Sequence, residues 1–311
     1  MDTKRGDTMN KKIGVALGGG SARGLAHIGV LKVFEKYGVP VDYVAGTSMG
    51  AIIGGLFASG IPASEIEKFA VGLDRKKALK FLSPSWSHSG LINGKNIAGY
   101  LSTLVPDRNI SNLPIRFKAV ATDFYCGEKY TIEKGSLWEA VRASCSIPVI
   151  FTPAVSGGKI LLDGGLSDPL PTSVVKSMGA DIVVSVNVVP TPEYKKNVRN
   201  RKSLVGNLAS RINGWRLLPL KKSGKKLFNV EYSRRKKILP GIMNISMQTR
   251  NIIEYNLILM DIGINKPDFL IEPNRDVIIG WFEFDRAREI IRNGEKAAMK
   301  IIGPLMKKIN S

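Results

Sequence analysis

The sequence predicts an α/β fold built around a parallel sheet. Short apolar segments alternate with segments in which apolar residues recur at helical spacing. The first unit has a strand at 13–17, a glycine-rich loop, a helix that ends near Gly38 and a second strand at 41–45. A strand, a crossover helix and a second strand form a βαβ unit, whose strands run parallel. The 311 residues, 44% of them hydrophobic, suit a single domain at 11–311 after a disordered tail at 1–10.

The rest of the chain continues this alternation of strands and helices. We expect strands at 117–122, 129–133, 159–162, 181–188 and 268–272. We expect helices at 49–59, 62–73, 137–144, 172–178 and 242–262, and a final one at 285–305. Residues 74–110 are polar and mixed, which indicates loop and short helices near the entrance of a site.

The number of cysteines and the lack of targeting signals indicate the cellular compartment of the protein. The two cysteines, Cys126 and Cys145, argue against a disulfide framework and fit a reducing compartment. No apolar run is long enough for a membrane span, and the first residues lack the apolar segment of a secretion signal. We therefore expect a cytoplasmic protein, either free or peripheral on the inner face of the membrane.

The net charge of +20 is concentrated in one segment, 191–240, which we interpret as a basic insertion. The segment contributes +13, because fifteen basic residues are opposed only by Glu193 and Glu231. The basic residues are Lys195, Lys196, Arg199, Arg201, Lys202, Arg211, Arg216, Lys221, Lys222, Lys225, Lys226, Arg234, Arg235, Lys236 and Lys237. Such a charge favours a membrane, nucleic acid or an acidic protein as partner. The alternative is a solvated linker.

Two details favour a membrane surface. Leu204, Leu208, Ile212 and Trp215 fall on one face of a helix, as in amphipathic helices that lie on membranes. Aromatic residues are few among the basic ones, which gives little support for stacking on nucleic-acid bases. We therefore expect an anionic membrane surface as partner and no nucleic acid.

The segment Gly46-Thr47-Ser48-Met49-Gly50 has the G-x-S-x-G pattern of a nucleophile elbow. Such a serine stands on a sharp turn between a strand and a helix, where little room remains for side chains at Gly46 and Gly50. The first turn of the helix then lies near the reacting oxygen, where it favours negative charge. The alternative is a glycine-rich turn with an incidental serine, because short patterns occur by chance.

A second glycine-rich loop, Gly18-Gly19-Gly20-Ser21-Ala22-Arg23-Gly24, follows the first strand. Its backbone N–H groups at Gly18, Gly19, Gly20 and Ser21 suit an oxyanion hole, since both loops open on the same edge of the sheet. A dinucleotide site is the rival, with Asp42 near the place of the ribose-binding acid, but Arg23 stands where the third glycine belongs. A purely structural loop is the third option. Arg23 either anchors the loop or makes a salt bridge or cap at the helix start.

A serine nucleophile needs a base, and three residues are candidates. The chain has only two histidines, His27 in the first turns of a helix and His88 in a polar loop. Asp163 ends an apolar strand and precedes Gly164-Gly165, which we expect to place its carboxylate at the carboxyl edge of a parallel sheet, within reach of Ser48. A helix cap or turn residue is the alternative role for Asp163.

Together these segments resemble the bacterial patatin-like phospholipases. The resemblance rests on three motifs in order: the Gly18–Gly24 loop, the Ser48 elbow and Asp163-Gly164-Gly165. It implies a three-layer α/β/α fold with a mainly parallel sheet, and a Ser–Asp dyad that needs no catalytic histidine. The residues that it carries over as motif support are Arg23, Gly24, Gly46, Met49, Gly50, Gly164 and Gly165. Ser21 departs from the family pattern, since many members have glycine at this place.

The resemblance implies a serine acyl hydrolase of the phospholipase A or lysophospholipase type. Ser48 would be the nucleophile and Asp163 the base, and no metal or cofactor would be required. The same acyl-enzyme serves an acyltransferase, and a basic membrane-binding module with little catalysis is a further alternative. The motifs do not specify the headgroup, the acyl length or the oligomeric state.

Overall fold

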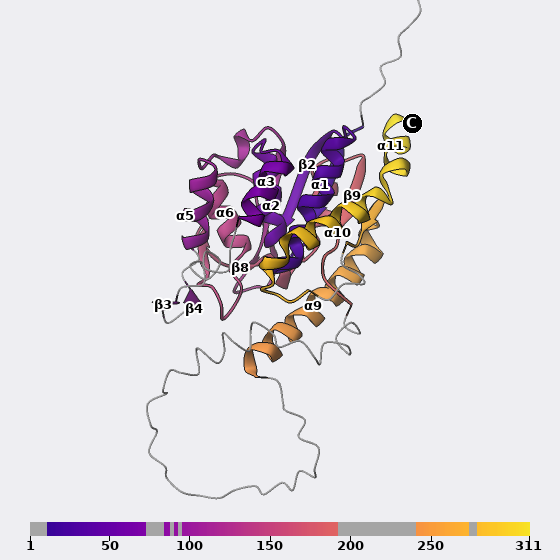
Figure 1. Ribbon diagram of the computed structural model, residues 1–311. Coiled ribbons are helices and arrows are strands. Elements are labelled where there is room, and N and C mark those ends of the chain that lie inside the picture. Colours follow the sequence, from indigo (N-terminus) through magenta and orange to yellow (C-terminus); the bar gives the residue numbers. More distant parts are fainter. Residues whose placement is uncertain (1–10, 73–83, 88–89, 93–94, 192–240, 274–278) are drawn as a thin grey trace, which may run out of the picture.

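A computed structural model describes residues 11–72, 84–87, 90–92, 95–191, 241–273 and 279–311 (Figure 1). The predicted tail at 1–10, almost all of the predicted basic insertion at 191–240, and His88 lie outside the described residues. Among the described helices, none combines the length and the apolar character that crossing a bilayer would need.

The centre of the molecule is an eight-stranded sheet. Its strands follow the order β10 (Phe269–Ile271), β9 (Ile182–Val186), β1 (Ile13–Leu17), β2 (Val41–Thr47), β5 (Arg116–Asp123), β8 (Lys159–Asp163) and β7 (Ala154–Ser156). Strands β10 to β5 are parallel, whereas β8 pairs antiparallel with β5 and β7 with β8. The remaining strand, β6 (Lys129–Ile132), also pairs antiparallel with β5. The predicted α/β fold with a mainly parallel sheet is thus confirmed.

Helices cover both faces of the sheet, which completes three layers (Figure 1). One face carries α1 (Ala26–Lys36), α2 (Met49–Ala58), α3 (Ala63–Val71), α6 (Leu137–Ser144) and α10 (Ala287–Met299). The other carries α7 (Thr172–Ser177) and α9 (Ile242–Asn265). Val15 and Leu17 of β1 belong to the core of the first face, and Ala16 to that of the second. Burial on both faces explains why β1 is apolar without alternation.

The structure describes part of the segment 74–110, namely 84–87, 90–92 and 95–110. Within 74–110 we expected loop and short helices, but the described part contains an antiparallel pair, β3 (Pro84–Ser87) and β4 (Gly90–Ile92). It also contains the ten-residue helix α5 (Lys95–Leu104). A short helix was therefore correctly expected here, whereas the strand pair was not.

The single C-terminal helix expected at 285–305 is divided. A short 3-10 turn, η5 (Phe284–Arg286), precedes α10, and a separate helix, α11 (Ile302–Asn310), follows it. Pro304 lies in the first turn of α11, where its missing N–H costs no helical hydrogen bond. Continued through this point, one helix would bring the proline ring against the carbonyl of Lys300. The apolar stripe of α10 therefore ends before the proline.

Candidate active site

Ser48 stands on the turn between β2 and α2, as the elbow pattern predicts. Its backbone has φ 54° and ψ −117°, a conformation that costs energy for a residue with a side chain. A Cβ on Gly46 would lie 2.4 Å from the carbonyl oxygen of Gly50, and one on Gly50 would lie 2.0 Å from that of Leu17. Both glycines are therefore required by the close approach of α2 to the strand ends.

A serine and a cysteine at the end of α6 support the elbow. The Ser48 N–H donates to Oγ of Ser144 (2.9 Å), which in turn donates to the carbonyl of Val120 (2.5 Å). The buried Cys145 thiol contacts the Ser48 side chain. Burial raises the pKa of the Cys145 thiol, and the charge of Asp163 raises it further. The thiol thus stays protonated, so Cys145 is a neighbour of Ser48 and not a thiolate nucleophile.

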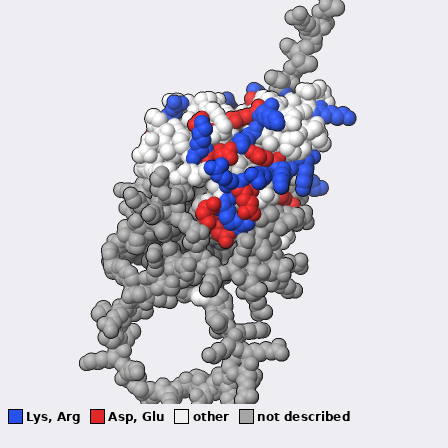
Figure 2. Space-filling model, viewed as in Figure 1, with Lys and Arg blue, Asp and Glu red and all other residues white. Residues whose placement is uncertain are grey.

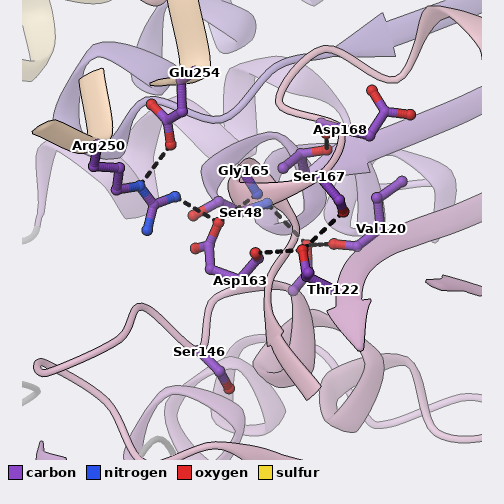
Figure 3. A network of polar contacts seen from close by, with 12 residues as sticks. Ser48, Val120, Thr122, Ser146, Asp163, Gly165, Ser167, Asp168, Arg250 and Glu254 are labelled. Carbon is purple, nitrogen blue, oxygen red and sulfur yellow. Dashed lines mark hydrogen bonds and ion pairs between the residues drawn. The ribbon is translucent and has the colours of Figure 1, made fainter. Parts of the chain in front are cut away.

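Asp163 reaches the elbow from an antiparallel strand, not from the parallel edge that we expected. β5 extends past the end of β2, since Thr47 pairs with Val120 and the residues after Val120 pair with β8. β8 runs back along this extension and ends at Asp163, opposite Ala121. Thr47 and Asp163 therefore pair with adjacent residues of β5, Val120 and Ala121, which places Asp163 beside the turn at Ser48. In Figure 3 the side chains of Ser48, Asp163 and Arg250 gather at one place.

The two carboxylate oxygens of the buried Asp163 differ in their contacts. Oδ1 accepts hydrogen bonds from the N–H of Gly165 (2.8 Å) and from Nη2 of Arg250 (2.6 Å). Oδ2 has no hydrogen-bond partner among the described residues. A buried carboxylate oxygen without a donor is unusual, because buried polar atoms are nearly always paired. It leaves Asp163 with one oxygen able to accept a proton.

In the loop after β1, some backbone N–H groups donate hydrogen bonds within the protein and others do not. Gly18 N–H donates to Val186 O (3.1 Å) and Gly19 N–H to Pro169 O (2.9 Å). The N–H groups of Gly20 and Ser21 make no hydrogen bond within the described part of the chain. Of the four predicted oxyanion donors, the last two are therefore free, and the first two hold the loop on the sheet.

Arg23 anchors this loop, as one of the two sequence interpretations proposed. The side chain is 2% exposed, and its Nε donates to the carbonyl of Gly20 (3.2 Å). Its Nη2 donates to Oδ1 of Asn251 (3.1 Å), and its guanidinium lies 5.4 Å from the ring centre of Trp281. Trp281 in turn accepts, at its backbone oxygen, the N–H of Ala22 (3.1 Å) and the hydroxyl of Ser21 (2.5 Å).

His27 contacts the loop and not the serine. Its Nε2 donates to the carbonyl of Gly18 (2.8 Å), and the ring is fully buried. Burial lowers the pKa of His27 to about 4, although the hydrogen bond to Gly18 opposes this shift. The ring is therefore neutral near pH 7 and supports the loop. His88, the other histidine, is among the residues that the structure does not describe.

Sequence analysis missed three residues of this site, Arg250 and Glu254 on α9 and Trp281 after it. Arg250 donates to Oε1 of Glu254 (2.6 Å) as well as to Asp163, and its guanidinium lies 5.3 Å from the ring centre of Trp281. The available signal was an arginine and a glutamate one turn apart on a helix with only one other charged residue, Asp261.

Ser48 opens on an apolar cavity of about 180 Å³. The cavity is lined by Ser21, Leu25, Ser48, Met49, Ile52, Ile53, Leu56, Ile66, Phe69, Ala70, Tyr100, Leu101, Leu104, Cys145, Ile147, Phe151, Phe282 and Phe284. None of these side chains is charged at neutral pH. A closed apolar cavity of roughly 150 Å³ binds a benzene molecule, so this one has room for part of one hydrocarbon chain.

The sequence model of the family described as Patatin-like phospholipase matches residues 15–176, just over half of the chain. The chain belongs to the patatin-like phospholipase family. The matched region contains both glycine-rich loops and Asp163, whereas α9 and Trp281 lie beyond it.

Curated relatives show the same similarity. An uncharacterised NTE family protein of Mycobacterium bovis is 37% identical over 177 residues, which cover 57% of this chain and 49% of that protein. Patatin-like phospholipase domain-containing protein 7 of Mus musculus is 32% identical over 212 residues, 66% of this chain and 15% of that one. Lysophospholipase nte1 of Emericella nidulans is 35% identical over 184 residues, which cover 57% of this chain and 12% of that protein.

This chain therefore spans about half of the mycobacterial relative and a small part of the two others. Among solved structures, VipD from Legionella pneumophila matches 95% of this chain and 67% of its own, with a TM-score of 0.48 and 15% identity.

Proposed function

We propose that this protein is a serine hydrolase of lipid esters in which Ser48 is the nucleophile and Asp163 the base. One observation carries the proposal: a strained serine that lines an apolar cavity, beside a buried carboxylate with one oxygen that has no hydrogen-bond partner among the described residues. Membership in a phospholipase family supports it, as does the name lysophospholipase of one relative.

The geometry suits acyl transfer through an acyl-enzyme. Ser48 Oγ attacks the ester carbonyl while Oδ2 of Asp163 accepts its proton. The free N–H groups of Gly20 and Ser21 stabilise the oxyanion, and one such donor contributes about 3–4 kcal/mol elsewhere. Asp163 then protonates the leaving alcohol. In the second half it takes a proton from the water that attacks the acyl-enzyme, and it then returns this proton to Ser48 Oγ as the fatty acid is released.

The cavity favours a substrate with one acyl chain near the serine. Its lining is aliphatic and aromatic, and burying a methylene group in such surroundings contributes about 0.8 kcal/mol. Its volume of about 180 Å³ is small for two chains side by side. A charged headgroup would find no charged partner among the lining residues, so we place the headgroup outside the cavity.

We also propose that the protein approaches its substrate on an anionic membrane surface. The charge of 191–240 supports this, and α9 supports it independently. The side chains of Ile245, Ile253, Met260 and Ile264 on α9 are 50%, 42%, 63% and 78% exposed. All three charged residues of this helix lie on its inner side or are half-buried. A helix with apolar residues outward and charges inward is expected to contact something apolar.

A fluorophosphonate probe tests the dyad, because it labels activated serines without a lipid substrate. We expect the label at Ser48 in the wild type, located by mass spectrometry, and no label in Ser48→Ala. Asp163→Asn should lower the labelling rate by about 10²–10⁴, the usual contribution of a general base. Asp123→Asn is the matched control, since it alters a buried carboxylate on the neighbouring strand that pairs with Lys159.

Hydrolysis of a lysophospholipid by the same variants then tests the substrate class. Activity in Asp163→Asn equal to that of the wild type would contradict the dyad. Labelling of Ser48 without hydrolysis of any single-chain lipid ester, with anionic vesicles present, would leave an activated serine but contradict the lipid substrate.

A further inference from the structure

A buried group of charged side chains stands behind Asp163, and it comes from a part of the chain outside the family match. Arg250 is 8% exposed and Glu254 is 0% exposed, one helical turn apart on α9. Nε of Arg250 donates to Oε1 of Glu254, and its Nη2 donates to Oδ1 of Asp163; each of the two hydrogen bonds is 2.6 Å long (Figure 3). The guanidinium therefore joins one carboxylate from the sheet to one from the helix.

The turn after Asp163 is shaped to admit this group. A Cβ on Gly165 would lie 2.4 Å from Oε1 of Glu254 and 2.5 Å from Nη2 of Arg250. The same glycine donates its N–H to Oδ1 of Asp163. The second glycine of the Asp-Gly-Gly motif thus leaves room for the α9 side chains and adds a second donor to the oxygen that Arg250 holds.

These contacts distinguish the two oxygens of the carboxylate. Oδ1 has two donors, one of them charged, which is the stronger kind of hydrogen bond. Oδ2 has none within the described residues. We propose that Arg250 and Glu254 are positioning residues of the dyad: Arg250 fixes the carboxylate through Oδ1 so that Oδ2 stays free for the Ser48 proton, and Glu254 fixes Arg250. The inference rests on the proposed role of Asp163 as the base.

The same helix also supports the oxyanion loop. The Trp281 ring is contacted by two guanidinium groups, with that of Arg250 5.3 Å and that of Arg23 5.4 Å from the ring centre. Asn251, next to Arg250, accepts a hydrogen bond from Arg23. The Trp281 carbonyl holds the loop at Ser21 and Ala22. The base and the oxyanion donors are therefore held by one set of side chains.

The charges around Asp163 give the proposal a pH signature. The titratable groups that face it are Arg250 and Glu254 on α9 and Cys145 at the end of α6, with Arg23 beyond Glu254. Burial raises the pKa of Glu254, and the charge of Arg250 opposes this. Without Arg250 two buried carboxylates would face each other, a situation that favours binding of a proton. A base must be ionised to act. The acid limb of the pH–rate profile, where the rate falls as the pH is lowered, would then move to higher pH.

The experiment measures the fluorophosphonate labelling rate of Ser48 between pH 5 and 9. The informative variant is Arg250→Met, because it removes the cation and leaves two buried carboxylates, those of Asp163 and Glu254. We expect its rate at pH 7 to fall at least about tenfold and its acid limb to move up by about one pH unit or more. Arg250→Lys keeps the cation and should move the limb less. Arg286→Met is the matched control, since Arg286 joins Glu283 and Glu289 at the surface.

The result is read only in variants whose thermal unfolding shows a folded protein. If Arg250→Met does not fold, the double variant Arg250→Met with Glu254→Gln is compared with Glu254→Gln alone, because these two differ only in the cation. A folded variant without Arg250 that has the same rate and the same acid limb as its reference protein would overturn the inference. So would an equal loss of rate at every pH, because that indicates only a structural role. Failure of the proposed function looks different: Ser48 would then not be labelled in the wild type, or Asp163→Asn would label normally.

Discussion

Two serines that line the cavity have backbone conformations unusual for residues with side chains. Ser21 has φ 51° and Ser48 has φ 54°. Each such residue costs on the order of 1–3 kcal/mol and persists only where its surroundings impose it. Ser21 is tied to the Trp281 carbonyl, and Ser48 is enclosed between the close approaches at Gly46 and Gly50. Both serines line the same cavity, which supports the proposal that this cavity is the active site.

His27 makes stability depend on pH at the acid side. Its pKa is about 4 in the fold against 6.5 for an ordinary histidine, so between these values only the unfolded chain binds the proton. Stability is therefore fully present above about pH 6.5 and is lost as the pH falls toward 4, by about 3 kcal/mol in total. We expect His27→Gln to flatten this part of the profile, measured as the free energy of unfolding in urea from pH 4 to 7.

The same variant separates support from catalysis. Because His27 holds the Gly18 carbonyl and does not contact Ser48, His27→Gln should retain most labelling of Ser48 near pH 7. A loss of labelling as large as that of Asp163→Asn in a folded His27→Gln protein would show that the histidine takes part in the proton transfer.

At the scale of elements, the crossing of α1 and α10 depends on two glycines. A Cβ on Gly294 would lie 1.9 Å from the carbonyl oxygen of Ala26, and one on Gly29 would lie 2.0 Å from that of Ile291. Neither backbone can give way without separating the helices. We expect Gly294→Ala to lower the free energy of unfolding by about 1–3 kcal/mol, the cost of overpacking, measured by urea denaturation.

Gly303 on α11 supplies the control, because nothing lies within 4 Å of a Cβ built there. In a helix, alanine is favoured over glycine by about 1 kcal/mol, so Gly303→Ala should be neutral or stabilising. Equal destabilisation by both variants would mean that the contact between α1 and α10 is looser than its geometry indicates.

The elements that could be predicted well are those whose structure is determined by residues close together in the sequence. The βαβ start, the turn at Ser48 and the end of β8 at Asp163 each depend on residues next to one another in the chain. The antiparallel direction of β8 could not be predicted, because it depends on its pairing with β5. Arg250 was missed for the same reason: 87 residues separate it from Asp163, and no local pattern joins them.

For the whole molecule, the distribution of charge matters more than its sum. On the face in Figure 2, acidic and basic side chains are intermixed over the helices, whereas 191–240 contributes +13 of the +20. At about 1 kcal/mol for each basic residue near an anionic surface, this segment would provide most of the attraction to a membrane. The exposed apolar side chains of α9, which follows the segment directly, would then enter the interface.

Vesicle sedimentation can separate local charge from total charge. We expect replacement of Arg234, Arg235, Lys236 and Lys237 by glutamine to weaken binding to anionic vesicles by about two to three orders of magnitude at low salt. The matched control replaces four exposed residues, Arg288, Arg292 and Lys296 on α10 and Lys300 directly after it, and changes the net charge equally. Met260→Glu with Ile264→Glu should weaken the binding that remains at high salt, where charge attraction is screened. Equal effects of the two glutamine sets would show that total charge alone governs binding and that α9 needs no particular orientation toward the lipid.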